Sequence, residues 1–363
     1  MNSVSIRRVW ERRGLSGKLL WLLLLPVSTI YSGVIRFRNT LYSLGWLKSE
    51  ALPRPVISIG NLTVGGTGKT PTCLWLAQEL AKRGLRVGIL SRGYRRNQTT
   101  PVILQPKSED GESPGSELAV LQAGDEPLMM ARLYGQTVGV AKNRQHAAKE
   151  LLRNGDLDVF ILDDGFQHRR LKRDVDLLLL GNDSAGWVLP AGPFREPRRG
   201  LGRADWYLIT GAEADWQSLL PADGAKRRFF GSLQAVGLIG FSGNRWREFP
   251  LSLLNRNKIL TVAGIADPRG LYRMIHEWEG EIVETLEFPD HYHYSSRDWQ
   301  QINRMARLVD LIVTTEKDIV KLVRFPFAKD KLLALRVVMA VHNGDLMVEA
   351  IIDKIRRHIA PTN

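Results

Sequence analysis

The chain has 363 residues, a formal net charge of +13 and one cysteine, Cys73. At about 150 residues per domain, this length predicts about two domains. A hydrophobic content of 44% with 25% charged residues is ordinary for a globular protein with a sizeable core. One cysteine excludes an internal disulfide, disfavours a cysteine-based metal site and fits a reducing compartment. The positive charge predicts an anionic partner, which can be phospholipid, nucleic acid or a phosphorylated substrate.

Residues 1–50 hold nearly half of this charge, with eight lysines and arginines against two glutamates, a net +6. Within them, residues 19–25 are six leucines and a tryptophan, followed by Pro26. A spanning helix needs about 20 apolar residues, so we expect Pro26 to break a run that is too short to span. With Trp21 and Tyr31 as anchors, the segment is predicted to lie in the headgroup region of an anionic membrane. A buried core helix, a membrane span and a signal peptide are alternatives, the last disfavoured because it would export a nucleotide site.

From residue 55 onward, short β-branched runs alternate with longer polar stretches of helical spacing, which is typical of βα units. Uninterrupted apolar runs such as 177–180 predict strands buried on both faces, and so a parallel sheet covered by helices. The expected strands are residues 56–59, 87–90, 138–140, 159–162, 175–180, 206–209, 259–263, 282–288, 311–314 and 337–340. Few strand signals occur in residues 211–257, so a domain boundary is placed there.

A glycine-rich loop follows the first expected strand, and a helical pattern follows the loop. Strand, loop, Gly-Lys-Thr and helix together indicate a P-loop, in which backbone N–H groups and the helix N-terminus surround phosphate oxygens. The residues predicted to bind ATP are Thr63, Val64, Gly65, Gly66, Thr67, Gly68, Lys69 and Thr70. Lys69 is expected at the terminal phosphates and Thr70 at Mg²⁺. The strict pattern has glycine at the position of Thr63, so the loop is expected to begin with a different turn; a chance Gly-Lys-Thr in a glycine-rich turn is the alternative.

Two acids, Asp163 and Asp164, follow the apolar run 159–162. The carboxyl ends of parallel strands border the crevice in which α/β sheets bind ligands. With the P-loop, this pair predicts a Mg²⁺ site and an enzyme that transfers or hydrolyses phosphate. The expected fold is therefore α/β, a P-loop NTPase-like parallel sheet flanked by helices with a second, smaller α/β lobe. The predicted division is a membrane-associating segment at 1–50, a P-loop domain at 51–215 and the second lobe at 216–363.

Eight further short blocks occur in one order along the chain. They are Ser91-Arg92-Gly93-Tyr94, Gly124-Asp125-Glu126-Pro127, Asp163-Asp164-Gly165-Phe166-Gln167-His168, Leu189-Pro190-Ala191-Gly192-Pro193, Arg195-Glu196-Pro197, Arg203-Ala204-Asp205, Phe288-Pro289-Asp290-His291-Tyr292 and Thr314-Thr315-Glu316-Lys317-Asp318. In this order, with the P-loop ahead of them, they resemble the tetraacyldisaccharide 4′-kinases. The resemblance implies transfer of the γ-phosphate of ATP to the 4′-hydroxyl of a tetraacylated glucosamine disaccharide 1-phosphate, which forms lipid IV-A in lipid A synthesis. It also implies a peripheral or monotopic protein at the cytoplasmic face of the bacterial inner membrane.

The same resemblance implies roles for single residues. Asp125 is similar to the family's catalytic acid, which accepts the proton of the attacking hydroxyl, and His291 to its partner in a dyad. Since the two lie one in each predicted lobe, we expect lobe closure to assemble the site. Gln167 and His168 are expected beside the phosphates, and Arg144, Arg195 and Glu196 at the substrate. From residue type alone, Asp125 is equally suited to begin a helix and His291 to pack among its aromatic neighbours.

Two other classes of protein are alternatives. A membrane-associated GTPase should carry an Asn-Lys-x-Asp sequence, and Asn257-Lys258-Ile259-Leu260 lacks the aspartate. A nucleic-acid-dependent ATPase should line a groove with basic and aromatic residues, whereas the basic residues here surround a leucine-rich segment. The expected ligands are therefore ATP, Mg²⁺, a lipid A disaccharide precursor and an anionic membrane surface. Neither nucleic acid nor an obligate protein partner is expected.

Overall fold

The computed structural model describes residues 3–94, 96, 100–106, 117–212, 216, 219, 220, 227–243, 245–328 and 330–359. The chain forms two compact units. The first unit comprises Met1–Val87, Asp156–Ser232 and Ala340–Asn363, and the second comprises Gly88–Gly155 and Leu233–Met339. Because the chain enters the second unit twice, a single boundary near residue 215 does not describe this division. The assignment of functions to residues 51–215 and 216–363 stays a prediction.

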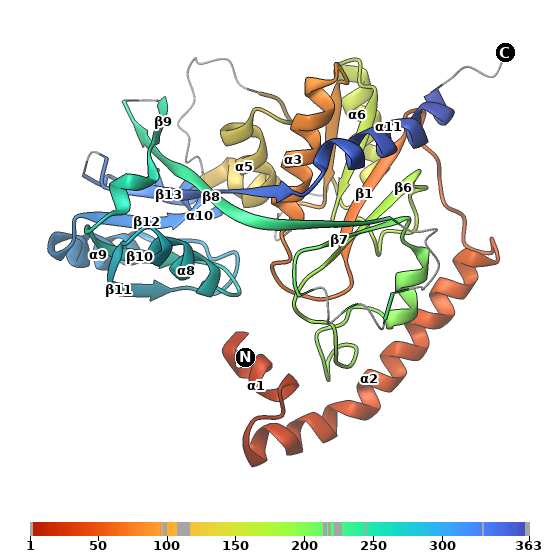
Figure 1. Ribbon diagram of the computed structural model, residues 1–363, viewed down its shortest axis with the longest axis horizontal. Coiled ribbons are helices and arrows are strands. Elements are labelled where there is room, and N and C mark those ends of the chain that lie inside the picture. Colours follow the sequence, from red (N-terminus) through yellow and green to blue (C-terminus); the bar gives the residue numbers. More distant parts are fainter. Residues whose placement is uncertain are drawn as a thin grey trace. The chain divides into compact units, whose positions relative to one another are not determined.

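A parallel sheet forms the centre of the first unit (Figure 1). Its strands, in spatial order, are β7 (Trp206–Ile209), β6 (Val175–Leu180), β1 (Val56–Asn61) and β5 (Val159–Asp163), with the start of β8 (Arg228–Ser242) beside β7. Every residue of β1, β5 and β6 is buried, as the uninterrupted apolar runs predict. Helix α3 (Lys69–Lys82) packs on β1 and β5, and α11 (Gly344–Ile359) packs on α3 and β6. The predicted P-loop-type α/β fold is confirmed.

The second unit contains two sets of strands. One set runs in the order β11 (Glu281–Glu287), β10 (Lys258–Ala263), β12 (Leu311–Thr315), β13 (Leu332–Val341) and β8, with β9 (Arg245–Phe249) antiparallel on β8. Its helices are α8 (Arg269–Glu277), α9 (Ser296–Met305) and α10 (Glu316–Leu322), with short 3-10 turns at Leu251–Leu254 and Ala306–Leu308. The other set is β2 (Val87–Ser91), β4 (Thr137–Val140) and β3 (Val102–Leu104), with α4 (Glu117–Ala123), α5 (Asp125–Tyr134) and α6 (Arg144–Asn154).

The expectation of few strands in residues 211–257 is wrong. β8 alone has 15 residues, and β9 follows it. The middle of β8 alternates between exposed and half-buried residues, but glycines and polar side chains interrupt its sequence, so it has no apolar run. Gly240, near the buried end of β8, is closely packed, since a Cβ there would lie 2.7 Å from Leu333 Cδ2. Strand β3 was also not predicted, and β13 is longer than the predicted 337–340.

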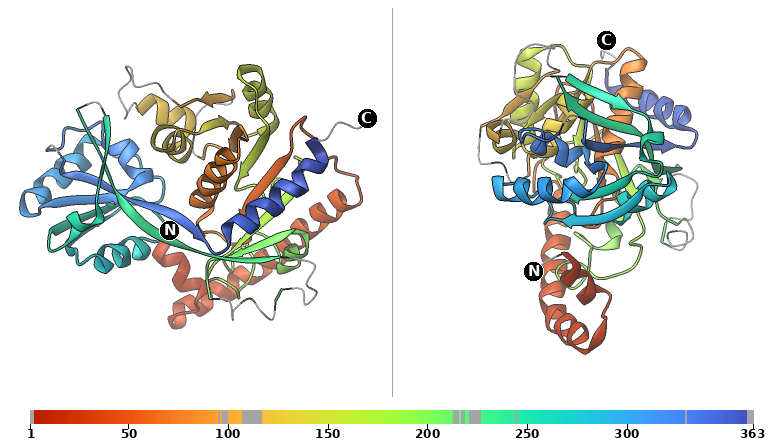
Figure 2. Two further views of the ribbon diagram at one scale, coloured as in Figure 1. Left: turned by 45° about the horizontal axis from the view of Figure 1, so that its top comes forward. Right: turned by 90° about the vertical axis from the view of Figure 1, so that its left-hand side faces the viewer.

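Helix α2 (Gly14–Ser43) overturns the prediction that Pro26 breaks the leucine-rich run. It is continuous for 30 residues with Pro26 inside it, and α1 (Ser3–Trp10) packs beside it (Figures 1 and 2). Proline removes one backbone hydrogen bond, and Pro26 lies on the exposed face, where its ring meets no packed neighbour. In the described part of the chain, α2 is the one helix long and apolar enough to cross a membrane.

Two opposite stripes run along α2. Exposed apolar side chains recur at three- and four-residue spacing on one of them, at Leu15, Leu19, Leu22, Leu23, Val27, Ile30, Val34 and Phe37. The other stripe is held to the first unit by hydrogen bonds from Ser28 Oγ to Val188 O (2.7 Å) and from Tyr31 Oη to Arg195 O (2.8 Å). The helix is therefore amphipathic in three dimensions, although its sequence reads as a leucine run.

Helices α5 and α10 pack against each other inside the second unit. The Tyr134 hydroxyl at the end of α5 donates to Glu316 Oε1 at the start of α10 (2.6 Å), and the Val337 N–H donates to Glu316 Oε2 (3.1 Å). Burial raises the pKa of Glu316 to about 7. This contact joins the two helices that carry Asp125 and Lys321.

Candidate active site

The P-loop connects β1 to α3 as predicted. Helix α3 begins at Lys69, directly after Gly68, whose φ of 83° lies in the left-handed region that glycine tolerates best. Gly65, with φ at 120°, has the same requirement. The chain therefore turns so that its backbone N–H groups and the N-terminus of α3 meet at the loop.

The structure explains why Thr63 replaces the first glycine of the strict pattern. Thr63 forms an antiparallel bridge with Phe194. On either side of it, the Val64 N–H donates to Pro193 O (2.8 Å) and the Arg195 N–H donates to Leu62 O (2.7 Å). The loop thus starts as an extended, paired segment, a conformation that does not need glycine. The prediction that the loop begins with a different turn is confirmed.

The carboxylates of Asp163 and Asp164 lie in different surroundings. Arg195 Nη1 lies 2.7 and 2.8 Å from the two oxygens of Asp164, and Lys69 Nζ lies 3.7 Å from Asp164 Oδ1. Asp163 is buried and accepts a hydrogen bond from Cys73 Sγ (3.5 Å). Burial, followed by the charge of Asp163, raises the pKa of the Cys73 thiol, so the thiol stays a neutral donor. Arg195 is therefore placed at the P-loop acids by its own ion pair.

Three buried polar atoms around the loop have no hydrogen-bond partner within the described residues: Asn61 Nδ2, Thr67 Oγ1 and Gln167 Oε1. Buried polar groups are rarely left unpaired, so such a cluster indicates missing ligand atoms. The amide and hydroxyl suit phosphate oxygens, and the carbonyl of Gln167 suits a metal-bound water. Among the residues described, no three His, Cys, Asp or Glu side chains are grouped so that they could hold a metal ion by themselves. Mg²⁺ needs no such group here, because one or two carboxylates plus phosphates and water complete its shell; Thr70, Asp163 and Asp164 offer hard oxygen donors that fit it.

Glu196 lies at the centre of a buried hydrogen-bond network, with a side chain 2% exposed. It accepts hydrogen bonds from Arg203 Nη2 (2.7 Å to each oxygen), Gln167 Nε2 (2.9 Å) and Asn39 Nδ2 (3.0 Å). Gln167 also donates to Asn61 O at the end of β1 (2.9 Å). Four hydrogen bonds from three donors on two oxygens leave little capacity for a lipid substrate, so this geometry favours a positioning role for Glu196.

Helix α2 contributes directly to this network, which the sequence did not predict. Asn39 bonds to Glu196, Arg38 Nη2 donates to Gln167 O (3.2 Å), and Tyr31 bonds to the backbone of Arg195. The apolar run predicted a membrane contact, but nothing in it pointed to the polar residues at 31–39. A polar residue at every third or fourth position of an apolar helix is the signal that could have identified them.

In the second unit, His291 Nδ1 lies 2.8 and 3.1 Å from the two oxygens of Asp125. The two side chains therefore form the predicted contact, and both belong to the second unit. Their work as a dyad and the predicted division into lobes stay predictions. Two stretches of the chain form this unit: Asp125 lies in the first, Gly88–Gly155, and His291 lies in the second, Leu233–Met339. Asp125 is the first residue of α5, behind the N-cap Gly124, and is 5% exposed.

The surroundings of the pair determine its protonation. Burial by itself raises the pKa of Asp125, but the hydrogen bond from His291 and the charge of Lys321 outweigh burial and hold this pKa well below its ordinary range. An ionised carboxylate only accepts, so Nδ1 of His291 carries the proton of this hydrogen bond, while Nε2 lies 3.8 Å from Asp290 Oδ2. The backbone of His291 has φ at 57°, a left-handed conformation that a non-glycine residue keeps only where its surroundings hold it.

The remaining predicted residues are placed as follows. Arg144 begins α6 in the second unit, is buried, and donates from Nη1 to Lys142 O (3.3 Å). His168 follows Asp164 in the turn after β5, where its backbone N–H donates to Gly165 O (2.8 Å).

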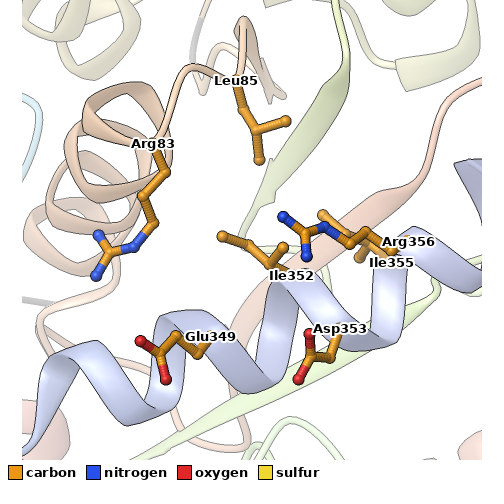
Figure 3. A pocket seen from close by; sticks show the side chains of 7 residues that line it. All are labelled: Arg83, Leu85, Glu349, Ile352, Asp353, Ile355 and Arg356. Atoms are coloured by element: carbon orange, nitrogen blue, oxygen red, sulfur yellow. The ribbon is translucent and has the colours of Figure 1, made fainter.

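A small cavity of about 10 Å³ beside the Asp125–His291 pair is also lined by Tyr94, Val120, Gly124 and His293. A cavity of about 210 Å³ between α11 and the end of α3, drawn in Figure 3, contains none of the predicted residues.

A P-loop with a paired lysine and two strand-end acids, together with a buried Asp–His pair, defines a nucleoside-triphosphate-dependent phosphotransferase. The sequence matches the family described as tetraacyldisaccharide-1-P 4′-kinase over residues 20–356. The chain belongs to this family.

Individual relatives agree with the family match. The tetraacyldisaccharide 4′-kinase of Pelobacter propionicus is 38% identical over 89% of this chain and 90% of its own length. That of Aquifex aeolicus is 36% identical over 82% of this chain and 89% of its own. The crystal structure of LpxK from Aquifex aeolicus in complex with ATP aligns with a TM-score of 0.74 and 32% identity, covering 93% of this chain and 99% of that one.

Replacing Glu196 by alanine tests whether this residue positions the site or binds substrate. Its removal leaves the guanidinium of Arg203, 19% exposed, without its partner carboxylate, and breaking a buried pair costs at most about 3–5 kcal/mol. We therefore expect a lower melting temperature for Glu196→Ala in scanning fluorimetry. Arg198→Ala, an exposed neighbour in the same segment, is the control and should melt like the wild type. An unchanged melting temperature with only a raised KM for lipid would instead identify Glu196 as a substrate ligand.

Proposed function

We propose that this chain transfers the γ-phosphate of ATP to the 4′-hydroxyl of a tetraacylated glucosamine disaccharide 1-phosphate, the activity named for its relatives. The observation that carries the proposal is the 2.8 Å hydrogen bond between Asp125 and His291 in a chain that also has a P-loop. A nucleotide hydrolase needs to position only water, whereas a kinase benefits from a base that deprotonates an alcohol. The product is lipid IV-A.

The first unit handles the nucleotide in this proposal. Residues 63–70 surround the phosphates; the Val64 N–H is bonded to Pro193 O, so the phosphate-binding N–H groups come from the loop after it and from the N-terminus of α3. Lys69 supplies a positive charge at the terminal phosphates. Mg²⁺ would be held by Thr70 with Asp163 or Asp164, and it would neutralise negative charge on the nucleotide phosphates. Arg195 pairs with Asp164, so it orients this acid and adds charge beside the phosphates rather than binding the lipid. Gln167 and His168 complete the wall of the phosphate site.

Within the dyad, we assign the proton acceptor to Nε2 of His291. Both oxygens of Asp125 are engaged, by His291, by the Glu126 N–H (3.0 Å) and by Lys321 Nζ (3.2 Å). A carboxylate with a depressed pKa is also a weak base, whereas a neutral imidazole is suited to this work near neutral pH. The 4′-oxygen attacks the γ-phosphorus while its proton moves to His291, and the bond from phosphorus to the β-bridging oxygen breaks to release ADP. Asp125 orients the imidazole and stabilises its protonated form.

The acceptor lipid is anionic, and the protein offers positive charge for it. Arg144 stays our proposed contact to its 1-phosphate or sugar. The net charge of +13 and the basic segment 1–50 favour an anionic surface over a neutral one.

Membrane attachment is proposed through the exposed stripe of α2. The opposite stripe is hydrogen-bonded to the first unit from Ser28 to Asn39, so this part of the helix lies along the protein rather than apart from it. A helix that is held along its length and exposes one apolar face is typical of in-plane attachment. ATP is available on the cytoplasmic side, so the proposed location is the cytoplasmic face of the bacterial inner membrane, as a peripheral or monotopic protein.

A double-mutant cycle tests the dyad. We expect His291→Ala and Asp125→Ala each to lower kcat by about 10²–10⁴-fold, with little change in KM for ATP. Because the two residues act as a unit, the double variant should lose far less than the product of the single losses. Losses that multiply would show that the residues work independently, and wild-type kcat in His291→Ala would remove the proposed base altogether.

Substitutions on the exposed stripe of α2 test the attachment. Leu23 and Ile30 are 73% and 69% exposed, so Leu23→Ser with Ile30→Ser should leave the melting temperature unchanged. Loss of two apolar side chains from the bilayer should weaken binding to phosphatidylethanolamine–phosphatidylglycerol vesicles by about 10-fold or more, at about 0.8 kcal/mol per buried CH₂ group.

The matched control is Leu308→Ser, which changes a leucine of similar exposure in the second unit and should keep full vesicle binding. If the α2 variant sediments with vesicles as strongly as the control, the stripe is not the membrane contact.

A further inference from the structure

Lys321 is a buried lysine for which the steps above give no role. Its side chain is 5% exposed, and its Nζ lies 3.2 Å from Asp125 Oδ2 and 2.8 Å from Asp318 Oδ1. The ring of Tyr294 lies below it, 5.4 Å from Nζ. Burying an ammonium is costly unless it is paired. A lysine held between two carboxylates, one of which belongs to the dyad, is therefore a candidate for a functional part of the site.

The contacts of Lys321 close a ring that contains both members of the dyad. Asp125 bonds to His291, the His291 N–H donates to Gly264 O (3.2 Å), and the Gly264 N–H donates to Asp318 Oδ2 (2.9 Å). Asp318 pairs with Lys321, and Lys321 returns to Asp125. This ring of contacts therefore holds both the carboxylate of Asp125 and the left-handed backbone of His291.

Two further observations show that the ring is tightly built. Asp318 is 0% exposed, and the Thr315 hydroxyl at the start of α10 donates to its Oδ2 (2.7 Å). Gly264 admits no side chain, because a Cβ there would lie 2.9 Å from Asp318 Oδ1 and 3.0 Å from the Tyr294 hydroxyl. Asp318 therefore presents its other oxygen, Oδ1, to Lys321 in a fixed position.

The charges in direct contact with the dyad are nearly balanced. Lys317 Nζ contacts Asp290 Oδ1 (2.5 Å), and Asp290 Oδ2 lies 3.8 Å from His291 Nε2. The dyad and its charged neighbours comprise three carboxylates, of Asp125, Asp290 and Asp318, and two ammonium groups, of Lys317 and Lys321. The ring of Tyr94 lies against His291, and Glu126 lies near Lys317. These three carboxylates and two ammonium groups sum to one negative charge while His291 is neutral, and to none when it carries the abstracted proton. The cluster is suited to a histidine that gains a proton during the reaction.

We propose that Lys321 is a positioning residue of the phosphotransfer: held by Asp318, its ammonium fixes the carboxylate of Asp125 in the orientation that aligns His291 and keeps that carboxylate ionised. This inference rests on the proposed role of the dyad. A lysine that only neutralised the buried Asp318 would have no effect on the reaction once Asp318 was also neutral. This difference separates the two roles.

The experiment compares Lys321→Met with the double variant Lys321→Met/Asp318→Asn. Lys321→Met removes the cation between two buried carboxylates, so it should lower the melting temperature. It should also lower kcat by about 10- to 100-fold with KM for ATP unchanged, and move the acidic limb of the kcat–pH profile to higher pH, because the dyad, whose proton acceptor is His291, has lost the neighbouring ammonium of Lys321. In the double variant the melting temperature should recover, while kcat stays low and the acidic limb stays displaced. Recovery of wild-type kcat in the double variant would overturn the proposal.

Lys321→Arg keeps the inference testable if the methionine variants do not fold. Its guanidinium retains the positive charge with a different reach, so kcat should fall while the acidic limb stays at its wild-type pH. A displaced limb in Lys321→Arg, or wild-type kcat in this variant, contradicts the proposal. The dyad is judged separately: wild-type kcat in His291→Ala means that the proposed function of the dyad has failed. A low kcat there, with full activity in Lys321→Met/Asp318→Asn, rejects only the role of Lys321.

Discussion

The burial of the Asp125 carboxylate constrains the whole arrangement of the second unit. A carboxylate that is 5% exposed must be paired with donors, and His291 and Lys321 come from separate segments of the chain, after β11 and within α10. To bring them together, α5 must pack on α10, and the chain after β11 must turn back to the end of β10. The unusual backbone at His291 and the side-chain-free position at Gly264 follow from this same requirement. The contact between Tyr134 and Glu316 then holds the two helices at the distance that the pairing needs.

In the first unit, a similar principle connects the apolar helix α2 to the nucleotide site. Glu196 is buried and requires donors, and it finds them on α2, on the turn after β5 and in the 3-10 turn that contains Arg203 (Arg198–Arg203). The same segment holds Arg195, which pairs with Asp164 and bonds to the start of the P-loop. The helix proposed to bind the membrane is thus hydrogen-bonded to residues that position the P-loop acids. The proposed attachment to a bilayer and the order at the nucleotide site therefore depend on one set of hydrogen bonds.

The sequence was most informative where a local pattern has one physical meaning. Buried runs such as those of β5 and β6 identify parallel strands, and Gly65, Gly68 and Lys69 in a strand–loop–helix context identify a P-loop. Pairing over long distances leaves no such pattern: Asp125 and His291 are 166 positions apart, and no periodicity links them. Strand β8 was missed because glycines and polar residues interrupt its middle, although Leu233 and Ala235 pack against the core of the second unit. Pro26 was given too much weight, since α2 continues through it, with Ser28 and Tyr31 hydrogen-bonded to the rest of the first unit. Lys321 was missed because a lysine in a short helix reads as a surface residue.

The most direct test of the account is phosphate transfer from γ-labelled ATP to tetraacyldisaccharide 1-phosphate in detergent micelles, by the wild type and by Lys69→Ala. The wild type should label the lipid at its 4′-position. Lys69→Ala, with a melting temperature close to that of the wild type, should lose about 10²-fold or more in turnover, because the terminal phosphates lose their principal positive partner. A folded Lys69→Ala protein with wild-type turnover, or a wild-type protein that labels no lipid, would contradict the account.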